Sequence, residues 1–521
     1  MNLGDGLRLN AWRYPNKDAV VFEGRRLTYD QLNRRANQFA NAMLEKGFKR
    51  GDKVSLLMHN NLEFVEMYNG LARIGVVSVP VNFRLVEKEI CYIVENSDSK
   101  GLVVGADLLA TIDLETLPQL SKDDVFVVGD DIPAGWNSYE NLLEGQPETE
   151  PEVELSEADI FYFGYTSGTT GFPKGALIKT RNTLEVVRNA VLRNAGRTDV
   201  DMTKRVFLAI MPLCHSNSIW ATLITLWMGG TNVVFPSGKF SPEKLLETVE
   251  KEKVTTSSMV PTMITRILDL PDEVKNTYDI SSLTSLGSSS APLHTKTKVE
   301  ALKFFKNTSF SEGYGSTETG AVSTLRHKDQ QRKVRSIGKP NPGIQVRLKD
   351  EEGNLIKEPT VVGTLWVKTP SAFTGYYKEP EKTKEAFDDE GWVTAGDMAF
   401  FDEEGFYFLA DRKGDMIISG GENIYPREIE EVLVQHEAVA EAAVIGVPNE
   451  KWGEEVKAIV VLAEGATGDE QDILEFCKSR LAGYKRPRSV DFTDDFPRTA
   501  TGKVLKRIVK QKYWQGQERM I

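Results

Sequence analysis

Residues 166–175, with the sequence TSGTTGFPKG, combine in one short run the groups that bind a polyphosphate. Glycines allow backbone N–H groups to converge on an anion, hydroxyl side chains add hydrogen-bond donors, and Lys174 adds a mobile positive charge. The run is not a Walker A loop, because Lys174 is followed by Gly175 and not by Ser or Thr. We therefore predict a phosphate cradle. The alternative for a run of this composition is a surface loop.

A second run whose residues could do chemistry is 311–318, SEGYGSTE. Glu318 supplies the hard oxygen that Mg²⁺ prefers, and Thr317 supplies a hydroxyl group. Tyr314 offers a flat aromatic face to a nucleotide base. Taken alone, such a run is also typical of a turn followed by a capped helix.

Residues 211–230 contain no Asp, Glu, Lys or Arg. This stretch predicts an apolar lining for a ligand with an uncharged tail, and the alternative is that its large side chains form the core of a helix. His215 lies here too, as a pocket residue or as a histidine satisfied within the core. The expected lining residues are Ile219, Trp220, Leu223, Ile224 and Leu226.

Composition limits the classes of protein that fit. A chain of 521 residues exceeds the roughly 250–300 residues of a single core, so we expect at least two domains. The formal net charge of −12 argues against nucleic acid as the main partner. Residues 1–16 lack the apolar core of a signal peptide and no apolar run is long enough to cross a membrane, which predicts a cytoplasmic protein without a transmembrane segment. Cys91, Cys214 and Cys477 are too widely spaced for a structural zinc site.

One basic segment interrupts this acidic chain. Between residues 478 and 512, eleven Lys and Arg residues stand against three Asp residues, a local surplus of eight positive charges. An anionic ligand could dock there. The alternative is a solvated helical face, because Lys503, Lys506 and Lys510 recur at i, i+3 and i+7.

The hydrophobic pattern predicts two wound α/β lobes. In the first lobe, a strand at 160–165 precedes the phosphate cradle, and strands at 54–58 and 76–81 flank a helix at 62–74. The second lobe repeats this alternation. Its expected strands are 206–211, 232–235 and 254–259, and its expected helices lie around 219–227 and 242–251.

After about residue 340 the chain changes to short strands separated by glycines, which predicts a small β-rich subdomain. A separate unit of about 110 residues follows, with a helix beginning at Pro426. The expected strands of these two parts are 343–348, 363–368, 406–409, 442–447 and 456–462, and a last helix is expected at 469–481.

Several motifs in order along the chain resemble those of the adenylate-forming superfamily, which includes acyl-CoA synthetases, luciferases and peptide-synthetase adenylation domains. They are 27–29 (LTY), 165–175 (YTSGTTGFPKG), 311–318 (SEGYGSTE) and 497–503 (PRTATGK). The resemblance covers nearly the whole chain and implies an α/β fold. Its large N-terminal domain of two wound lobes and a β-rich subdomain is residues 1–411. A hinge at 412–415 joins it to a small mobile α+β C-terminal domain, residues 416–521.

The resemblance also implies a role for each matching residue, with ATP, Mg²⁺ and coenzyme A (CoA) as ligands. Lys503 is implied as the catalytic cation between the acid and the α-phosphate, and Asp397 as the acceptor for the ribose hydroxyls. Thr317 and Glu318 are implied at Mg²⁺, and Tyr314 against the adenine. The residues implied at the phosphates are Thr166, counted also as catalytic, Ser167, Gly168, Thr169, Thr170, Gly171 and Lys174. Further nucleotide-binding residues are Ser289, Ser290, Ala291, Pro292, Glu312, Gly313, Gly315, Ser316 and Arg412, and the acid-binding residues are His215, Trp220, Ser288 and Gly315.

In this superfamily the C-terminal domain rotates after adenylation, which withdraws the lysine that Lys503 matches. It then presents a glycine-rich loop, matched here by Gly420 and Gly421, beside which the pantetheine chain of CoA enters. Those two glycines could instead form a turn between strands. The hinge position that usually carries Asp or Lys is Gly414 here, which predicts looser pivoting. The superfamily usually has Gly or Ala at two further positions, Ser289 and Ser290 here.

The reaction implied is that of an AMP-forming acyl-CoA synthetase, an acid–thiol ligase. A carboxylic acid and ATP give an acyl-adenylate and pyrophosphate, and CoA then takes the acyl group and releases AMP. Relatives that activate amino acids place an aspartate near His215, so the uncharged stretch favours a fatty or aryl acid. Two alternatives stay open: an enzyme that loads an acyl carrier protein, and a nucleotide-binding protein without turnover. A homodimer is compatible with the resemblance.

Overall fold

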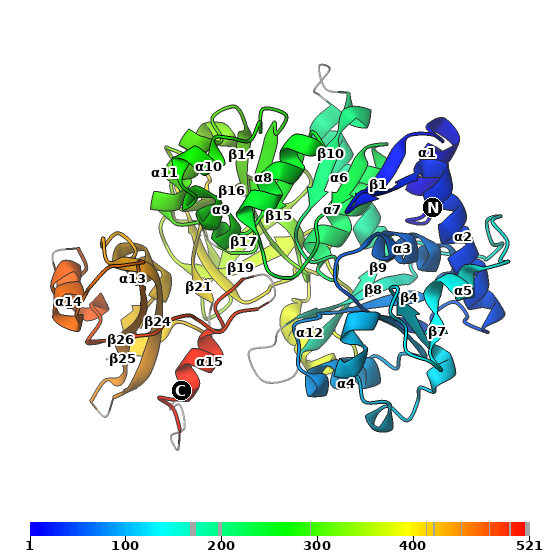
Figure 1. Ribbon diagram of the computed structural model, residues 1–521. Coiled ribbons are helices and arrows are strands. Elements are labelled where there is room, and N and C mark those ends of the chain that lie inside the picture. Colours follow the sequence, from blue (N-terminus) through cyan, green and yellow to red (C-terminus); the bar gives the residue numbers. More distant parts are fainter. Residues whose placement is uncertain are drawn as a thin grey trace.

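The computed structural model describes residues 1–166, 173–195, 201–291, 293–412, 414–419, 422–449, 451–478, 480–499 and 502–515. Figure 1 shows the first lobe in blue and cyan, a second lobe in green and yellow beside it, and a smaller C-terminal unit in orange and red at one side. This is the mixed α/β organisation that the sequence predicts.

The first lobe contains a seven-stranded sheet with the order β7-β6-β5-β3-β4-β8-β9. Its neighbours pair in parallel as far as β8, and β8 and β9 form an antiparallel hairpin. The strands are β3 (Lys53–Leu57), β4 (Val77–Val81), β5 (Gly101–Gly105), β6 (Val125–Val128), β7 (Asn137–Ser138), β8 (Ile160–Thr166) and β9 (Lys174–Lys179). The helices of this part are α1 (Asp5–Arg13), α2 (Tyr29–Glu45), α3 (Leu62–Ile74), α4 (Glu87–Asn96), α5 (Tyr139–Leu143) and α6 (Thr180–Ala195).

Strand β5 shows how this sheet is covered on both faces. Val103 belongs to the core that contains Phe39 of α2 and Phe64 of α3, whereas Leu102 and Val104 belong to the core on the α4 side. Successive side chains of a strand point to opposite faces, so a strand between two helical layers must be apolar throughout. That requirement explains the uninterrupted apolar sequence of β5.

The second lobe is built on a larger sheet with the order β18-β17-β19-β20-β21-β16-β15-β14-β13-β12-β10-β11-β1-β2. Strands β10 to β14 pair in parallel, and from β14 to β18 the pairing is antiparallel. The expected β-rich subdomain is therefore an antiparallel extension of this sheet, joined to it through β16 and β21.

The strands of the larger sheet are β1 (Asp18–Phe22), β2 (Arg25–Thr28), β10 (Val206–Ala209), β11 (Thr231–Val234), β12 (Thr256–Met259), β13 (Ser285–Ser288), β14 (Ser309–Ser316), β15 (Gly320–Leu325), β16 (Ser336–Pro340), β17 (Gln345–Lys349), β18 (Leu355–Ile356), β19 (Gly363–Lys368), β20 (Asp397–Phe401) and β21 (Tyr407–Arg412). Its helices are α7 (Ser216–Trp227), α8 (Pro242–Lys251), α9 (Pro261–Leu268), α10 (Asp272–Lys275), α11 (Thr295–Phe304) and α12 (Pro380–Ala386).

The C-terminal unit has a sheet and a core of its own (Figure 1). Strands β24 and β25 form a long antiparallel pair, and β22 and β26 both pair with β25. The elements are β22 (Ile417–Ser419), β23 (Glu422–Ile424), α13 (Pro426–Leu433), β24 (Val439–Asn449), β25 (Gly453–Leu462), α14 (Glu470–Lys478), β26 (Ser489–Phe492) and α15 (Lys506–Gln511).

Two of the alternatives raised by the sequence are not found. The run 311–318 continues β14 to Ser316 and then turns into β15, so it does not begin a helix. Lys503 does not share a helical face with Lys506 and Lys510, because α15 begins only at Lys506. Gly502 has a φ of +79°, which a right-handed helix excludes, and a turn results in which Thr499 N donates to Lys503 O at 2.7 Å.

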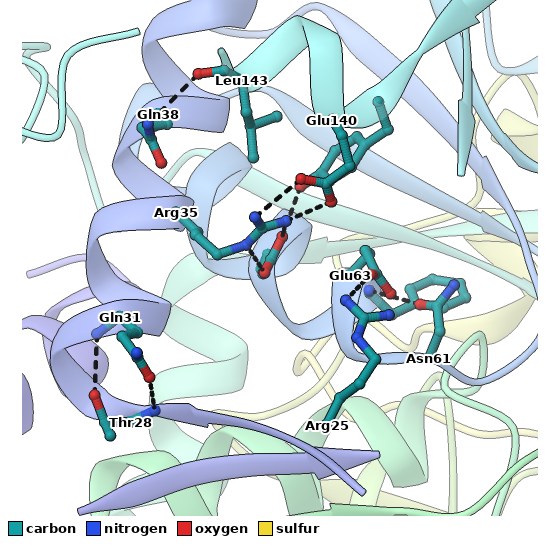
Figure 2. A network of polar contacts seen from close by, with 12 residues as sticks. Arg25, Thr28, Gln31, Arg35, Gln38, Asn61, Glu63, Glu140 and Leu143 are labelled. Carbon is teal, nitrogen blue, oxygen red and sulfur yellow. Dashed lines mark hydrogen bonds and ion pairs between the residues drawn. The ribbon is translucent and has the colours of Figure 1, made fainter. Parts of the chain in front are cut away.

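Local capping signals define the helices that support the first lobe. Thr28 and Gln31 form a capping box at the start of α2, in which each side chain bonds the backbone of the other (Figure 2). Asn61 caps α3, and Gly75 ends that helix with a φ of +66° in the left-handed region. Helices α2 and α3 therefore begin and end where their sequences provide the caps.

A buried ion pair joins the same two helices. Arg35 on α2 bonds Glu66 on α3 at 2.5 Å and Glu140 on α5 at 2.7 Å, and the Tyr139 hydroxyl donates to Glu66 at 3.0 Å. Figure 2 shows Arg35 directed toward Glu140. Glu66 is fully buried, and burial raises its pKa while the hydrogen bonds from Arg35 oppose that rise. The pair fixes the packing of α2, α3 and α5.

Replacing Arg35 by Met should destabilise the first lobe by about 3 kcal/mol, because the Glu66 carboxylate would stay buried without its cation. Urea unfolding followed by tryptophan fluorescence measures this loss. The matched control is Arg34→Met. The neighbouring Arg34 pairs with Asp30 at the exposed surface, so its loss should cost under about 1 kcal/mol. Adding Glu66→Leu to Arg35→Met should recover part of the loss, and equal midpoints for both single variants would contradict the assignment.

Candidate active site

The predicted phosphate cradle lies where β8 ends and β9 begins. Thr166 and Lys174 are register partners in this hairpin, so their backbones are adjacent. The Lys174 ammonium group lies 5.3 Å from the centre of the Tyr376 ring, within the range of a cation–π contact. The intervening predicted residues Ser167, Gly168, Thr169, Thr170 and Gly171 lie outside the described part of the chain, and their role stays a prediction.

Tyr376 connects the phosphate hairpin to Glu318. Its hydroxyl donates to Glu318 Oε1 at 2.8 Å, and its backbone forms a bridge with Ala176 of β9. Glu318 is only 8% exposed. Sequence reasoning missed Tyr376, because it lies 58 positions from Glu318 and belongs to no motif that spacing could reveal.

A chain of hydroxyl groups reaches the neighbouring Thr317. The buried Tyr162 of β8 donates to Ser216 Oγ at 2.9 Å, and Ser216 Oγ lies 3.4 Å from Thr317 Oγ1. A Cβ atom on Gly164 would lie 2.5 Å from the Thr317 methyl group, so β8 can approach the turn this closely only with glycine there. Burial raises the pKa of Tyr162, which keeps its proton available for donation.

Tyr314 and Asp397 are brought together from different strands. The Tyr314 hydroxyl on β14 donates to Asp397 Oδ2 on β20 at 2.6 Å, and Asp397 is 8% exposed. Asp397 is also the register partner of Arg412 on β21. The Arg412 side chain lies outside the described residues, so only its backbone is placed beside this carboxylate. Two groups that the sequence assigned to one nucleotide are thus direct neighbours.

The end of β13 carries the predicted serines. Ser288 is a register partner of Glu312, and Ser289 Oγ accepts a hydrogen bond from Asn217 Nδ2 at 2.9 Å. Ser290 has a φ of +70°, in the left-handed region where an L-residue costs about 1–2 kcal/mol. Ala291 follows it directly, and Pro292 lies outside the described residues.

Strand β14 brings the other predicted residues of its motif to the same edge. A Cβ atom on Gly315 would lie 2.1 Å from Gly320 O, so only glycine permits the β14–β15 turn to close. Ser316 Oγ lies 3.0 Å from Thr319 Oγ1 within that turn. Gly313 lies on β14 directly before Tyr314.

Glu312 anchors this strand to a helix. Its Oε1 lies 2.6 Å from Lys298 Nζ of α11, and Lys298 is 1% exposed. Burial raises the pKa of Glu312, and the positive charges of Lys298 and of Arg427 on α13 oppose the rise. The carboxylate therefore depends on a buried cation from another element.

Helix α7 carries the residues predicted to bind the acid. Three members of the apolar set, Ile219, Leu223 and Leu226, are packed in the core, and this leaves the half-buried Trp220 and Ile224 as candidates for a lining. His215 directly precedes the helix. Its Nε2 is buried without a hydrogen-bond partner among the described residues, and burial lowers the pKa of its ring to about 4. His215 is therefore neutral at physiological pH.

The predicted catalytic lysine lies in a loop that contacts the large N-terminal part. A Cβ atom on Gly502 would lie 3.2 Å from Thr262 Oγ1 and 3.8 Å from Val260 Cγ2. Val260 directly follows Met259, the register partner of Ser288, and Ser289 N donates to Met259 O at 3.3 Å. The backbone next to Lys503 thus lies at the same sheet edge as the serines of β13.

Of the remaining predictions, Gly414 lies in the turn between β21 and β22. Gly420 and Gly421 lie outside the described residues. Their neighbours Ser419 and Glu422 are antiparallel partners in β22 and β23.

These contacts form one connected site. Lys174 contacts Tyr376, and Tyr376 donates a hydrogen bond to Glu318, which directly follows Thr317. Tyr314 lies on β14, the strand that leads to Thr317, and it donates a hydrogen bond to Asp397. Among the described residues, no group of three or more His, Cys, Asp or Glu side chains could hold a metal without other ligands. A nucleotide-bound Mg²⁺ needs only one or two carboxylates, because phosphates and water complete its shell. A buried carboxylate oriented by Tyr376 beside a threonine hydroxyl fits that requirement.

Across the part of the chain that the structure describes, no helix combines the length and the apolar character needed to cross a membrane.

Comparison with known proteins covers nearly the whole chain. A family model described as "AMP-binding enzyme" matches residues 7–377, and one described as "AMP-binding enzyme C-terminal domain" matches residues 428–503. The second match ends on Lys503. Five of the predicted site residues lie between the two matches: Asp397, Arg412, Gly414, Gly420 and Gly421.

Two relatives and one solved structure show similarity at full length. Long-chain-fatty-acid–CoA ligase FadD13 of Mycobacterium tuberculosis is 34% identical over 508 residues, which are 97% of this chain and 96% of that protein. Feruloyl-CoA synthase of Amycolatopsis sp. is 34% identical over 501 residues, 96% of each chain. The crystal structure of ATP-bound MatB from Rhodopseudomonas palustris is 30% identical, with a TM-score of 0.87 over 98% of this chain and 99% of that one.

Tyr376→Phe should lower kcat for pyrophosphate release by about tenfold to a hundredfold, the effect of losing a hydrogen bond to a charged group. The KM for the acid should change little, because Tyr376 acts through Glu318. The Mg²⁺ concentration for half-maximal rate should rise. Steady-state kinetics with varied Mg²⁺ measure all three quantities.

The adjacent Tyr377→Phe is the matched control. The Tyr377 hydroxyl bonds the exposed Asp98 at 2.5 Å, away from Glu318, so this variant should keep the wild-type rate. Wild-type kinetics in Tyr376→Phe would show that the hydrogen bond to Glu318 has no part in positioning it.

Proposed function

The chain belongs to the family of AMP-binding enzymes, and from that membership and the geometry of its site we propose how its residues activate a carboxylic acid. It is an AMP-forming acyl-CoA synthetase, an acid–thiol ligase acting on a fatty or aryl acid. The observation that carries this conclusion is the full-length similarity to CoA ligases of both substrate classes. Both family domains are present, from residue 7 to residue 503.

The first half-reaction brings two anions together, since the carboxylate attacks the α-phosphate of ATP while pyrophosphate leaves. Catalysis requires fixed cations and donors where negative charge develops. In our proposal Lys174 and the hydroxyl of Thr166, on either side of the cradle, hold the β- and γ-phosphates. Lys503 bridges the attacking carboxylate and the α-phosphate. The contact of the Lys503 loop with Val260 and Thr262 supports this placement.

The nucleoside is held by groups that the fold orients in advance. Asp397 accepts hydrogen bonds from the ribose hydroxyls, and Tyr314 packs its ring against the adenine beside the serines of β13. The Tyr314–Asp397 hydrogen bond at 2.6 Å supports this proposal, because it fixes the ring and the carboxylate relative to each other before the nucleotide arrives.

Thr317 and Glu318 are the residues that would hold Mg²⁺ together with the phosphates. When bound, Mg²⁺ neutralises charge on the phosphate oxygens. Tyr376 positions Glu318, and the hydroxyl chain from Tyr162 through Ser216 positions Thr317.

The acid enters beside α7 in this proposal. A neutral His215 adds no positive charge that would compete for the carboxylate, and Trp220 offers an apolar surface to the tail. The absence of acidic side chains from residues 211–230 removes the usual partner for a substrate ammonium group and favours a fatty or aryl tail.

In the second half-reaction the thiol of CoA attacks the acyl-adenylate carbonyl, a thioester forms, and AMP leaves with the electron pair of the broken bond. Lys503 would obstruct this approach, so we propose that residues 416–521 rotate about 412–415 and withdraw it. Mg²⁺ dependence, a cytoplasmic location and a homodimer belong to the same set of predictions.

The function is tested by pyrophosphate release across a panel of fatty, alicyclic and aryl acids, each with CoA, with a holo acyl carrier protein, or with no acceptor. We expect pyrophosphate with at least one acid class and a thioester with CoA. Acylation of the carrier protein but not of CoA would show that the acceptor is a carrier protein. Binding of ATP without pyrophosphate release for any acid would identify a nucleotide-binding protein without turnover.

Lys503→Ala should lower the rate of acyl-adenylate formation by about a hundredfold to a thousandfold, as expected on losing a preorganised transition-state charge. The attack of CoA on supplied acyl-adenylate should stay within about threefold of wild type, because Lys503 is withdrawn for that step. Rapid-quench measurements separate the two half-reactions.

Lys512→Ala is the control for the charge of the same basic segment. Lys512 lies 3.4 Å from Asp491 within the C-terminal unit, so both half-reactions should be preserved. Equal loss of both half-reactions in Lys503→Ala would refute its assignment to adenylation.

A further inference from the structure

One carboxylate of the C-terminal unit is buried against the N-terminal part. Glu431 lies on α13 and is 9% exposed. Its Oε2 lies 3.2 Å from His294 Nδ1, and its Oε1 accepts hydrogen bonds from Thr295 N at 3.1 Å and from the Thr295 hydroxyl. All of its partners named here lie in the other domain, at the first turn of α11.

The chemistry of this contact favours a charged Glu431. Burial raises the pKa of the carboxyl, but the hydrogen bonds from His294 and Thr295 outweigh it and lower the pKa to about 2. The carboxylate also lies at the N-terminus of α11, where unpaired backbone N–H groups and the helix dipole favour negative charge. Separating the two domains would remove these partners together.

Both sides of the contact are rigid. Helix α13 buries Ile429 and Leu433 in the core of the C-terminal unit. Helix α11 is tied to β14 by the buried pair of Lys298 and Glu312, one turn after Thr295. The contact between Glu431 and α11 therefore fixes one domain relative to the other.

The same arrangement of domains brings the Lys503 loop to the site. The Gly502 backbone lies beside Thr262 and Val260, so that a Cβ atom there would be 3.2 Å from Thr262 Oγ1, while Glu431 contacts α11. The two contacts come from different parts of the C-terminal unit, α13 and the segment before α15. Their simultaneous formation fixes the orientation of that unit more closely than either contact could.

We propose that Glu431 is a positioning residue for adenylation: its hydrogen bonds to His294 and Thr295 hold the C-terminal domain in the orientation that presents Lys503. This inference rests on the proposed function, in which Lys503 serves the first half-reaction and is withdrawn for the second. Glu431 acts through Lys503, so its loss should affect one half-reaction and spare the other.

The kinetic test compares Glu431→Ala with Glu428→Ala. Glu428 lies on the same helix and pairs with Lys485 inside the C-terminal unit at 2.7 Å, so its removal changes the charge of α13 without touching α11. For Glu431→Ala we expect acyl-adenylate formation at least tenfold slower and CoA attack on supplied acyl-adenylate within twofold of wild type. Glu428→Ala should retain both rates. Thr295→Val, which removes one donor from the opposite side, should reproduce the split in weaker form.

Domain orientation is measured separately, without substrates, by fluorescence energy transfer. The three native cysteines are buried, so cysteines introduced by Lys303→Cys on α11 and Glu437→Cys in the C-terminal unit, both exposed positions, can be labelled selectively. Glu431→Ala should shift the distribution of transfer efficiencies, and Glu428→Ala should leave it unchanged.

The combined outcomes separate this inference from the proposed function. An unchanged distribution in Glu431→Ala overturns the positioning role, whatever the rates. A shifted distribution with slower adenylation and intact CoA attack supports it. A shifted distribution with equal loss of both half-reactions in Glu431→Ala and in Lys503→Ala overturns the assignment of Lys503, and the inference fails with it.

Discussion

A buried carboxylate must find hydrogen-bond donors, and this constraint organises the molecule. In each case described here, the donor comes from another element of the chain. Glu66 of α3 accepts hydrogen bonds from Arg35 of α2, and Glu312 of β14 forms an ion pair with Lys298 of α11. Glu318 and Asp397 in the site, and Glu431 in the C-terminal unit, follow the same rule with tyrosine, histidine and threonine donors. Two of these carboxylates, Glu318 and Asp397, are also groups to which we assign a role in the proposed reaction.

The sequence was most informative where the signal is local. The helices Leu62–Ile74 and Pro242–Lys251 have the bounds expected from their apolar pattern, and Asn61 and Ser241 supply side-chain caps where they begin. The wound lobes followed from alternating strands and helices. Family membership and the ligase function followed from motifs in a fixed order along the chain, such as residues 165–175. Each motif is a contiguous run, so it can be recognised without knowledge of the fold.

Partners distant in sequence could not be predicted in the same way. Tyr376 reaches Glu318 only because the chain returns to β9 between β19 and β20, and no residue spacing encodes that return. Glu431 is one of three glutamates in α13, and its contact with Thr295 depends on how two domains meet. The alternative of a helical face that includes Lys503 is not found, because Gly502 has a positive φ, a conformation that a charge pattern does not report.

The departures from the superfamily pattern at Ser289 and Ser290 have distinct physical meanings. Ser289 gains a partner, Asn217, so its hydroxyl links β13 to α7, the helix that we propose to bind the acid. Ser290 has a backbone conformation that glycine would adopt with less strain, which explains why glycine is usual at such a position. The strain is local to the nucleotide side of the site, where a fixed backbone helps orientation.

The polar character of the domain contact suits a two-step reaction. An extensive apolar interface would hold the C-terminal domain in one orientation, and in the proposed mechanism Lys503 would then block the attacking thiol. Hydrogen bonds to Glu431 are directional, so they define an orientation while they last, and water can replace them when the domains part. Hydrogen bonds of this kind can hold the orientation proposed for adenylation and still break before thioester formation. The burial of Glu431 at a helix terminus, and not at a solvated edge, makes that orientation specific.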